Sequence, residues 1–121
     1  MVGRRSAGLA PFDPRALAAY EAGLRQGGAA HGLCEDYRAS AGIDLKHDRE
    51  DRDAGRQLSM PLLVLWGEHG VVHRCFHPLA DWRRVAAHVE GRTLPCGHYI
   101  AEEAPEVLLD CVTPFFAREG T

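Results

Sequence analysis

The chain has 121 residues, of which 45% are hydrophobic and 26% are charged, an ordinary balance for one small globular domain. The formal net charge of −3, with basic residues scattered among acidic ones, argues against a nucleic-acid-binding surface, which needs clustered positive charge. No apolar run reaches the roughly 18–20 residues that span a bilayer, and the N-terminal segment lacks the apolar stretch of a signal peptide, so we expect a cytoplasmic protein that binds neither membrane nor nucleic acid.

A first helix is predicted after Phe12. Asp13 is a typical N-cap residue and Pro14 suits the first helical position. Apolar residues then repeat at helical spacing up to Leu24. The glycine pair at 27–28 is expected to end this helix.

A second helix is predicted from about Ala29. Its apolar face would carry Ala30, Leu33, Cys34, Tyr37 and Ala41. Gly42 is expected to weaken or bend it. The segment 44–57 is nearly all charged, with both signs interspersed, and indicates a solvated helix end and connector.

Two strands are predicted in the rest of the chain. The apolar run after Pro61, closed by Gly67, is typical of a strand buried on both faces, as in a parallel sheet. After a loop, a helix is expected that ends at Gly91, and "RTLPC" at 92–96 then predicts a short second strand. The apolar stripe of that helix would comprise Leu79, Trp82, Val85, Ala86 and Val89.

The strand–helix–strand unit is long enough for a crossover, so the two strands are predicted to be parallel. Two parallel strands alone do not make a stable sheet, which indicates that further strands belong to the fold. The last helix is expected to start at Pro105, and Pro114 should kink it or end it early.

His98 is a candidate catalytic base. It follows the second predicted strand and precedes the last helix, and catalytic groups of open α/β sheets gather at the carboxyl ends of strands. An imidazole suits this role because its ordinary pKa lies near neutrality. On position alone, a histidine that is merely hydrogen-bonded in a loop is an equally good interpretation.

A nucleophile is harder to find. None of the three serines, Ser6, Ser40 and Ser59, stands in a G-x-S-x-G turn after a strand. Asp44 lies near Gly42 but in a helical, charged context with no strand before it. No glycine-rich phosphate loop is present in the sequence.

Metal binding is not expected. His69, His73 and His77 recur every four residues, but Gly70 and Pro78 interrupt any helix that would stack them, so we expect a solvated loop. The cysteines lack zinc-site spacing and are interpreted as small buried apolar residues. They are Cys34, Cys75, Cys96 and Cys111.

Three segments together resemble a known family: "CEDYRASAGIDLKHD", "PLLVLWGEHGVV" and "WRRVAAHVEGRTLPCGHYIAEEAPE". They are similar to the C-terminal part of haloacetate (fluoroacetate) dehalogenases of the α/β-hydrolase superfamily, over residues 12 to 116. The "LPCGHYIAEEAPE" block is specific to the superfamily. With "CEDYRA" upstream it points to the dehalogenase branch or the closely similar epoxide-hydrolase branch.

The resemblance implies a partial α/β-hydrolase fold. Residues 1–57 would be the C-terminal part of a helical cap with its connector, and residues 58–121 the last two parallel strands of the core with their helices. Family members use an aspartate to displace halide from a haloacetate, and a histidine then activates water to hydrolyse the ester. His98 matches that histidine, and Tyr37 matches a cap tyrosine that helps to bind the halide. The resemblance implies a haloacetate-like small-molecule substrate and no cofactor, and it leaves a homodimer open.

The chain also departs from the family. Many hydrolases place the acid of the triad where Gly70 stands here. We expect the nucleophile and that acid to be encoded upstream of Met1, so that the 121 residues alone would be inactive. Two alternatives remain: an epoxide or ester hydrolase of the same fold, and a non-catalytic fragment or interaction domain that binds a partner through an open sheet edge.

Overall fold

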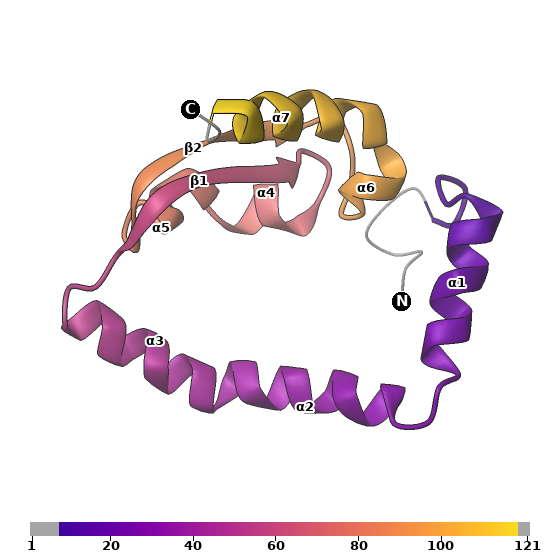
Figure 1. The fold of residues 1–121 in the computed structure, drawn as a ribbon, viewed down its shortest axis with the longest axis horizontal. Helices are drawn as coiled ribbons and strands as arrows, with labels where there is room; N and C mark the ends of the chain where they lie inside the picture. Colours follow the sequence, from indigo (N-terminus) through magenta and orange to yellow (C-terminus); the bar gives the residue numbers. More distant parts are fainter. Residues whose placement is uncertain (1–7, 119–121) are drawn as a thin grey trace. The chain divides into compact units, whose positions relative to one another are not determined.

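The computed structural model describes residues 8–118 and divides the chain into two compact units. One unit comprises residues 13–57 and is helical. The other joins residues 8–12 to residues 58–118 and contains both strands (Figure 1). Among the helices that the structure describes, none combines the length and apolar character needed to cross a bilayer.

The helical unit begins as predicted. Helix α1 spans Pro14–Leu24, and Asp13 caps it by accepting a hydrogen bond from the backbone N–H of Arg15 at 2.8 Å. The glycine pair does not end α1, which stops at Leu24, before both glycines. Gly28, with a φ of +87°, is instead the residue before helix α2, Ala29–Ala41, where a left-handed backbone favours glycine.

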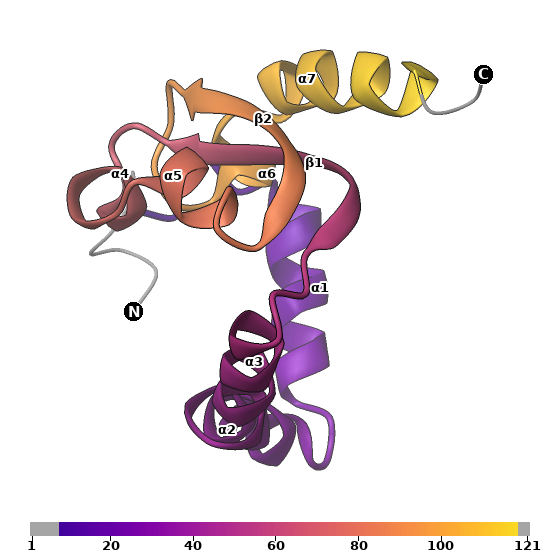
Figure 2. The ribbon, with the colours of Figure 1, turned by 90° about the vertical axis from the view of Figure 1, so that its left-hand side faces the viewer.

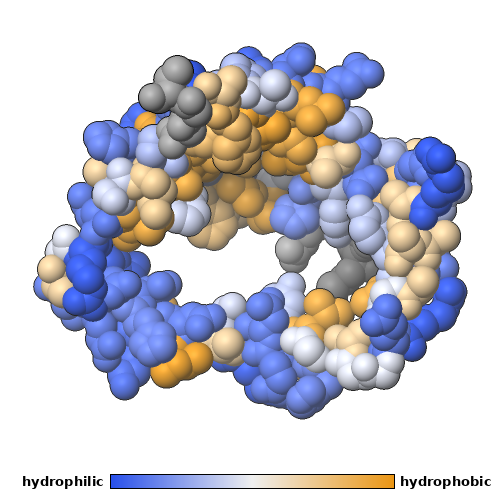
Figure 3. Space-filling model, in the orientation of Figure 1, coloured by the Kyte–Doolittle hydropathy of each residue, from blue (hydrophilic) through white to orange (hydrophobic). Residues whose placement is uncertain are grey.

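Gly42 interrupts the helical run, as expected. Helix α2 ends at Ala41 and helix α3 spans Ile43–Asp53, roughly in line with it in both ribbon views (Figures 1 and 2). The charged segment is therefore mostly helix rather than connector. Polar side chains cover α3 (lower left in Figure 3), and Lys46 and Glu50 form an ion pair at 3.8 Å one turn apart.

The apolar residues of this unit stay at its surface. None of the described residues in α1, α2 or α3 is buried. The large apolar side chains at least half exposed are Tyr20, Leu24, Leu33, Tyr37 and Ile43. The helical periodicity is thus confirmed, while the apolar faces stay exposed within the described residues.

The second unit contains two parallel strands, as predicted. Strand β1 spans Leu58–Gly67 and strand β2 spans Ala86–Leu94, with Val64 opposite Gly91 and Gly67 opposite Leu94. Strand β1 starts before Pro61, and its register shifts between Leu58 and Pro61. This irregularity accommodates a proline, which has no N–H to give to the ladder.

The prediction of a long helix before the second strand is wrong. Helix α5 spans only Pro78–Trp82, and the chain is extended from Ala86 onward. Gly91, expected to end a helix, lies in mid-strand: a Cβ there would come within 2.0 Å of the backbone oxygen of Val64. Pairing with β1 overrode an apolar spacing that suits a helix equally well.

Short helices flank the strands. Helix α4, Val71–Cys75, lies in the segment predicted to be a loop, and helix α6 spans Ile100–Glu103. Figure 1 shows α4 and α5 below the strands and α7, Pro105–Arg118, above them.

Helix α7 corrects a second expectation. It starts at Pro105 as predicted but continues through Pro114 to Arg118. The buried ring of Phe115 follows the proline directly and anchors this end of the helix. Tertiary packing thus offsets the backbone hydrogen bond that the proline removes.

The core of this unit is small. Leu94, Cys96 and Ala104 are buried together where β2 leads into α6. The partly buried residues that pack against them are Leu65, Ile100, Val107 and Cys111. In the predicted run after Pro61, Val64 and Gly67 are buried and the other residues are half-buried, so β1 is covered only in part.

The cysteine prediction holds only in part. All four cysteines are free. Cys96 is buried and Cys111 is half-buried, but Cys34 on α2 and Cys75 on α4 are exposed. Their interpretation as buried residues is wrong because the faces of α2 and α4 that carry them face outward.

Candidate functional site

His98 lies in a loop at the carboxyl ends of both strands. Because β1 and β2 are parallel, their ends at Gly67 and Leu94 lie side by side, and the loop follows directly from β2. The His98 side chain is exposed, whereas the preceding Gly97 is buried. The loop therefore has a fixed backbone and an accessible imidazole.

The end of β1 holds one side of this loop. The backbone N–H of Glu68 donates to the carbonyl of Leu94 at 3.0 Å, and the N–H of His69 donates to the carbonyl of Cys96 at 3.1 Å. These two bonds continue the parallel ladder past the ends of both strands. The chain just before His98 is thereby tied to the chain just after β1.

The Glu103 side chain holds the other side. Its carboxylate accepts a hydrogen bond from the N–H of Gly97 at 2.6 Å and a second from the N–H of Tyr99 at 3.1 Å. These donors are the backbone groups on either side of His98. Hydrogen bonds to an ionised carboxylate are roughly twice as strong as neutral ones.

Aromatic rings line the loop. The ring of Tyr99 meets the His98 imidazole edge to face, with centroids 5.2 Å apart. Its other neighbour is Phe12, at 5.4 Å in a similar geometry. Edge-to-face contacts of this kind contribute about 0.5–1.5 kcal/mol beyond the area they bury. They connect the segment before α1 to the loop that carries His98.

Cys96 lies beside the loop and is chemically quiet. Burial raises the pKa of its thiol, and the negative charges of Glu103 and Glu68 raise it further. The thiolate is the reactive form of cysteine. At neutral pH this side chain is a protonated core residue rather than a nucleophile.

Tyr37, the predicted halide ligand, belongs to the helical unit. It lies on α2 and is 77% exposed. Within the described residues its ring is therefore not packed into a core. His98 and Tyr37 remain predictions, each placed within its own unit.

The three histidines after β1 lie on different elements. His73 on α4 accepts a hydrogen bond at Nδ1 from the indole N–H of Trp66 at 3.2 Å, and His77 precedes α5. His69 lies in the turn before α4. Within residues 8–118, no group of three His, Cys, Asp or Glu side chains could hold a metal ion.

Sequence reasoning missed Glu103. A capping box pairs a Ser or Thr at the N-cap with a Glu or Gln three positions into the helix, and that pattern is absent here. Tyr99 occupies the N-cap of α6, and Glu103 reaches back from the end of the same short helix. The signal was the acidic pair that follows His98, which the pattern alone does not assign to the loop.

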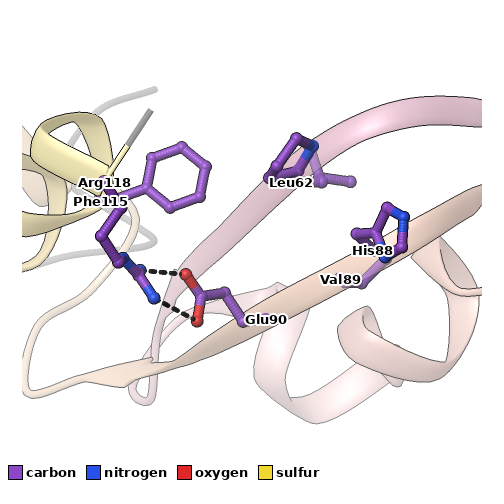
Figure 4. Close-up of a pocket in the computed structure, with 7 residues that line it drawn as sticks. Leu62, His88, Val89, Glu90, Phe115 and Arg118 are labelled. Atoms are coloured by element: carbon purple, nitrogen blue, oxygen red, sulfur yellow. Dashed lines mark hydrogen bonds and ion pairs between the residues drawn. The ribbon is translucent and has the colours of Figure 1, made fainter. Parts of the chain in front are cut away.

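A hollow of about 440 Å³ lies elsewhere in this unit (Figure 4). Leu62 on β1, Val89 on β2 and Phe115 on α7 line it, and Arg118 pairs with Glu90 across its edge. His98 is not among the lining residues. The catalytic candidate and this hollow are therefore separate features.

The chain resembles a dehalogenase in sequence. No protein-family model matches the sequence. The chain is 35% identical over 122 aligned positions to a fluoroacetate dehalogenase from Burkholderia sp. The alignment covers 99% of this chain and 40% of the dehalogenase. The chain thus spans about 40% of the length of this curated relative.

Solved structures with a similar fold are α/β hydrolases. A protein from Nostoc sp PCC 7120 assigned as an alpha/beta hydrolase superposes with a TM-score of 0.83 and 46% sequence identity, and the match covers 88% of this chain and 36% of the Nostoc chain. A variant of a protein from Pseudomonas aeruginosa assigned as an epoxide hydrolase, with bound MFA, superposes with a TM-score of 0.83 and 38% sequence identity. The match covers 93% of this chain and 38% of the Pseudomonas chain. The two parallel strands and their helices are therefore part of an α/β-hydrolase fold, as predicted.

Proposed function

We propose that this chain supplies the water-activating base of an α/β-hydrolase that removes halide from haloacetates. One observation carries the proposal: an exposed imidazole at the carboxyl ends of two parallel strands, on a loop whose backbone is bonded on both sides. The likeness to a fluoroacetate dehalogenase supports haloacetate as the substrate class.

The reaction has two displacement steps. An aspartate oxygen attacks the α-carbon of the haloacetate, the carbon–halogen bond breaks, and halide leaves with the bonding electron pair. His98 then takes a proton from water, and the resulting hydroxide adds to the carbonyl carbon of the enzyme ester. Glycolate leaves, the aspartate carboxylate is restored, and the imidazolium returns its proton to solvent. Such base catalysis typically contributes 10²–10⁴-fold to rate.

Tyr37 would assist the first step. A phenolic O–H is a good donor to a halide as negative charge develops on it. The exposure of Tyr37 on α2 leaves its hydroxyl available for this contact.

The attacking aspartate would belong to the part of the fold that the relatives have and these 121 residues do not span. In this chain Glu68 follows β1 and Pro95 follows β2, and neither stands in a G-x-nucleophile-x-G turn. We therefore expect no halide release from fluoroacetate or chloroacetate by the 121-residue protein.

A chimera tests the proposal directly. This chain would replace the region that it matches in the Burkholderia dehalogenase, and fluoride release from fluoroacetate would be followed. The chimera should turn over. With His98→Ala it should release about one fluoride per enzyme and then stop, because the ester forms without the base but is not hydrolysed.

His88→Ala is the matched control. His88 is exposed on β2, beside the hollow, so its removal should leave turnover unchanged. Full turnover in the His98→Ala chimera would disprove the assigned base. A folded chimera without any halide release would count against the substrate class.

An epoxide hydrolase is the second candidate, favoured by the Pseudomonas protein assigned to that activity. It would share the base and the ester intermediate and differ in the electrophile. Diol formation from styrene oxide by the chimera, with no halide release from haloacetates, would select it.

A further inference from the structure

We propose that Glu103 is a positioning residue that fixes the His98 imidazole for catalysis. Its two carboxylate oxygens accept the backbone N–H groups of Gly97 and Tyr99, at 2.6 and 3.1 Å. These residues are the immediate neighbours of His98. One side chain thus holds the peptide groups before and after the proposed base.

A glutamate suits this geometry because it carries two equivalent acceptors. An ionised carboxylate accepts at both oxygens, whereas an amide side chain has only one acceptor oxygen. Gly97 is buried, and its N–H bonds the carboxylate of Glu103. Loss of Glu103 would therefore remove the partner of a buried donor, which is costlier than the loss of an exposed hydrogen bond.

The local fold depends on the same side chain. Helix α6 has only four residues, Ile100–Glu103, and a helix this short has little stability of its own. Glu103 ends the helix and bonds Tyr99 at its start, which closes the segment on itself. On the opposite side, the turn after β1 holds the loop through the bond from the N–H of His69 to the carbonyl of Cys96. With its flanking peptides held, His98 is left with mainly side-chain freedom.

The positioning role rests on the proposed function, since it matters for catalysis only if His98 is the base. The two hydrogen bonds from the N–H groups of Gly97 and Tyr99 to Glu103 form what we call the clamp, and they can be measured without any enzymatic activity. Failure of the clamp and failure of the proposed function are thus separate results.

Amide hydrogen exchange in the 121-residue protein tests the clamp. Glu103→Ala should speed exchange at the Gly97 and Tyr99 amides about tenfold, while amides within β1 change less than about twofold. Glu103→Gln keeps one acceptor oxygen, so its exchange rates at these two amides should lie between those of Glu103→Ala and the unsubstituted protein. Glu106→Gln, at an exposed position in the first turn of α7, removes the same charge and should change neither amide.

Catalysis in the chimera gives the second readout. Glu103→Ala should lower kcat about ten- to a hundredfold and lower KM with it, leaving kcat/KM nearly unchanged, because halide displacement is intact while the misplaced base slows hydrolysis of the ester. Glu103→Gln should restore part of that loss. Normal kcat in both variants would overturn the positioning role.

The exchange data can also overturn the proposal. Acceleration in β1 equal to that at Gly97 and Tyr99 would mean that Glu103 merely stabilises the whole unit. If Glu103→Ala does not fold, the comparison passes to Glu103→Gln. Equal exchange rates at both amides in Glu103→Gln and in the unsubstituted protein would then show that the carboxylate does not hold the loop.

Discussion

Gly67 and Gly97 meet backbone to backbone at the ends of the two strands. A Cβ placed on Gly67 would lie 1.8 Å from the carbonyl oxygen of Gly97 and 2.5 Å from that of Cys96. Only hydrogen fits at this position. The end of β1 and the loop before His98 therefore share one close-packed joint, so disturbance at Gly67 is transmitted to the loop.

We expect Gly67→Ala to destabilise this unit by at least about 1–3 kcal/mol, the usual cost of overpacking, because backbone rather than a flexible side chain blocks the added methyl group. Urea unfolding followed by tryptophan fluorescence measures this loss. Gly23→Ala is the control for the substitution itself: Gly23 lies in the last turn of α1, a Cβ there meets nothing within 4 Å, and alanine has the higher helix propensity, so no loss of stability is expected. Equal stability of the Gly67 variant and the unsubstituted chain would contradict the close packing of the two backbones at Gly67.

Leu94 anchors the core beside the site. It is 1% exposed and packs where β2 leads into α6 and α7. Leu94→Ala should lower the free energy of unfolding by about 2–5 kcal/mol, through lost burial and the cavity left behind. Leu109→Ala removes the same atoms from a position that is 59% exposed and should change it by less than about 0.5 kcal/mol. Similar losses in both variants would refute this core.

Cys96 should give the protein an alkaline sensitivity. Burial and the charges of Glu103 and Glu68 raise its pKa in the folded chain, so the folded state holds the thiol proton more tightly than the unfolded state. The stability that this provides is complete below the ordinary thiol pKa of about 8.5 and is lost as the pH rises through the raised value.

Unfolding at pH 7 and pH 10 measures this effect. The loss of stability between the two pH values should be smaller in Cys96→Ala than in the unsubstituted protein. Iodoacetamide should also label exposed Cys34 and Cys75 in the folded protein well before it labels Cys96. Rapid labelling of Cys96 without unfolding would show that its thiol is neither buried nor protonated.

Local signals were enough for several features of this protein. Asp13 and Pro14 start α1, Gly42 separates α2 from α3, and the apolar run that ends at Gly67 forms β1. Each rests on interactions between residues close in sequence, such as a side chain that caps its own helix or a glycine that breaks one. The position of His98 after a strand followed from the same local pattern.

Long-range contacts settled the rest. Residues 86–91 have a spacing compatible with a helix, yet they form β2 because β1 offers a ladder to pair with, and Gly91 fits where the backbone of Val64 approaches. Helix α7 continues through Pro114 because packing outweighs one missing hydrogen bond. The bonds from Glu103 to the N–H groups of Gly97 and Tyr99 are local, but Tyr99 rather than Ser or Thr occupies the N-cap of α6, so the capping-box rule does not predict them. The energies that decided β2 and α7 arise only when distant segments meet, so a sequence pattern does not carry them.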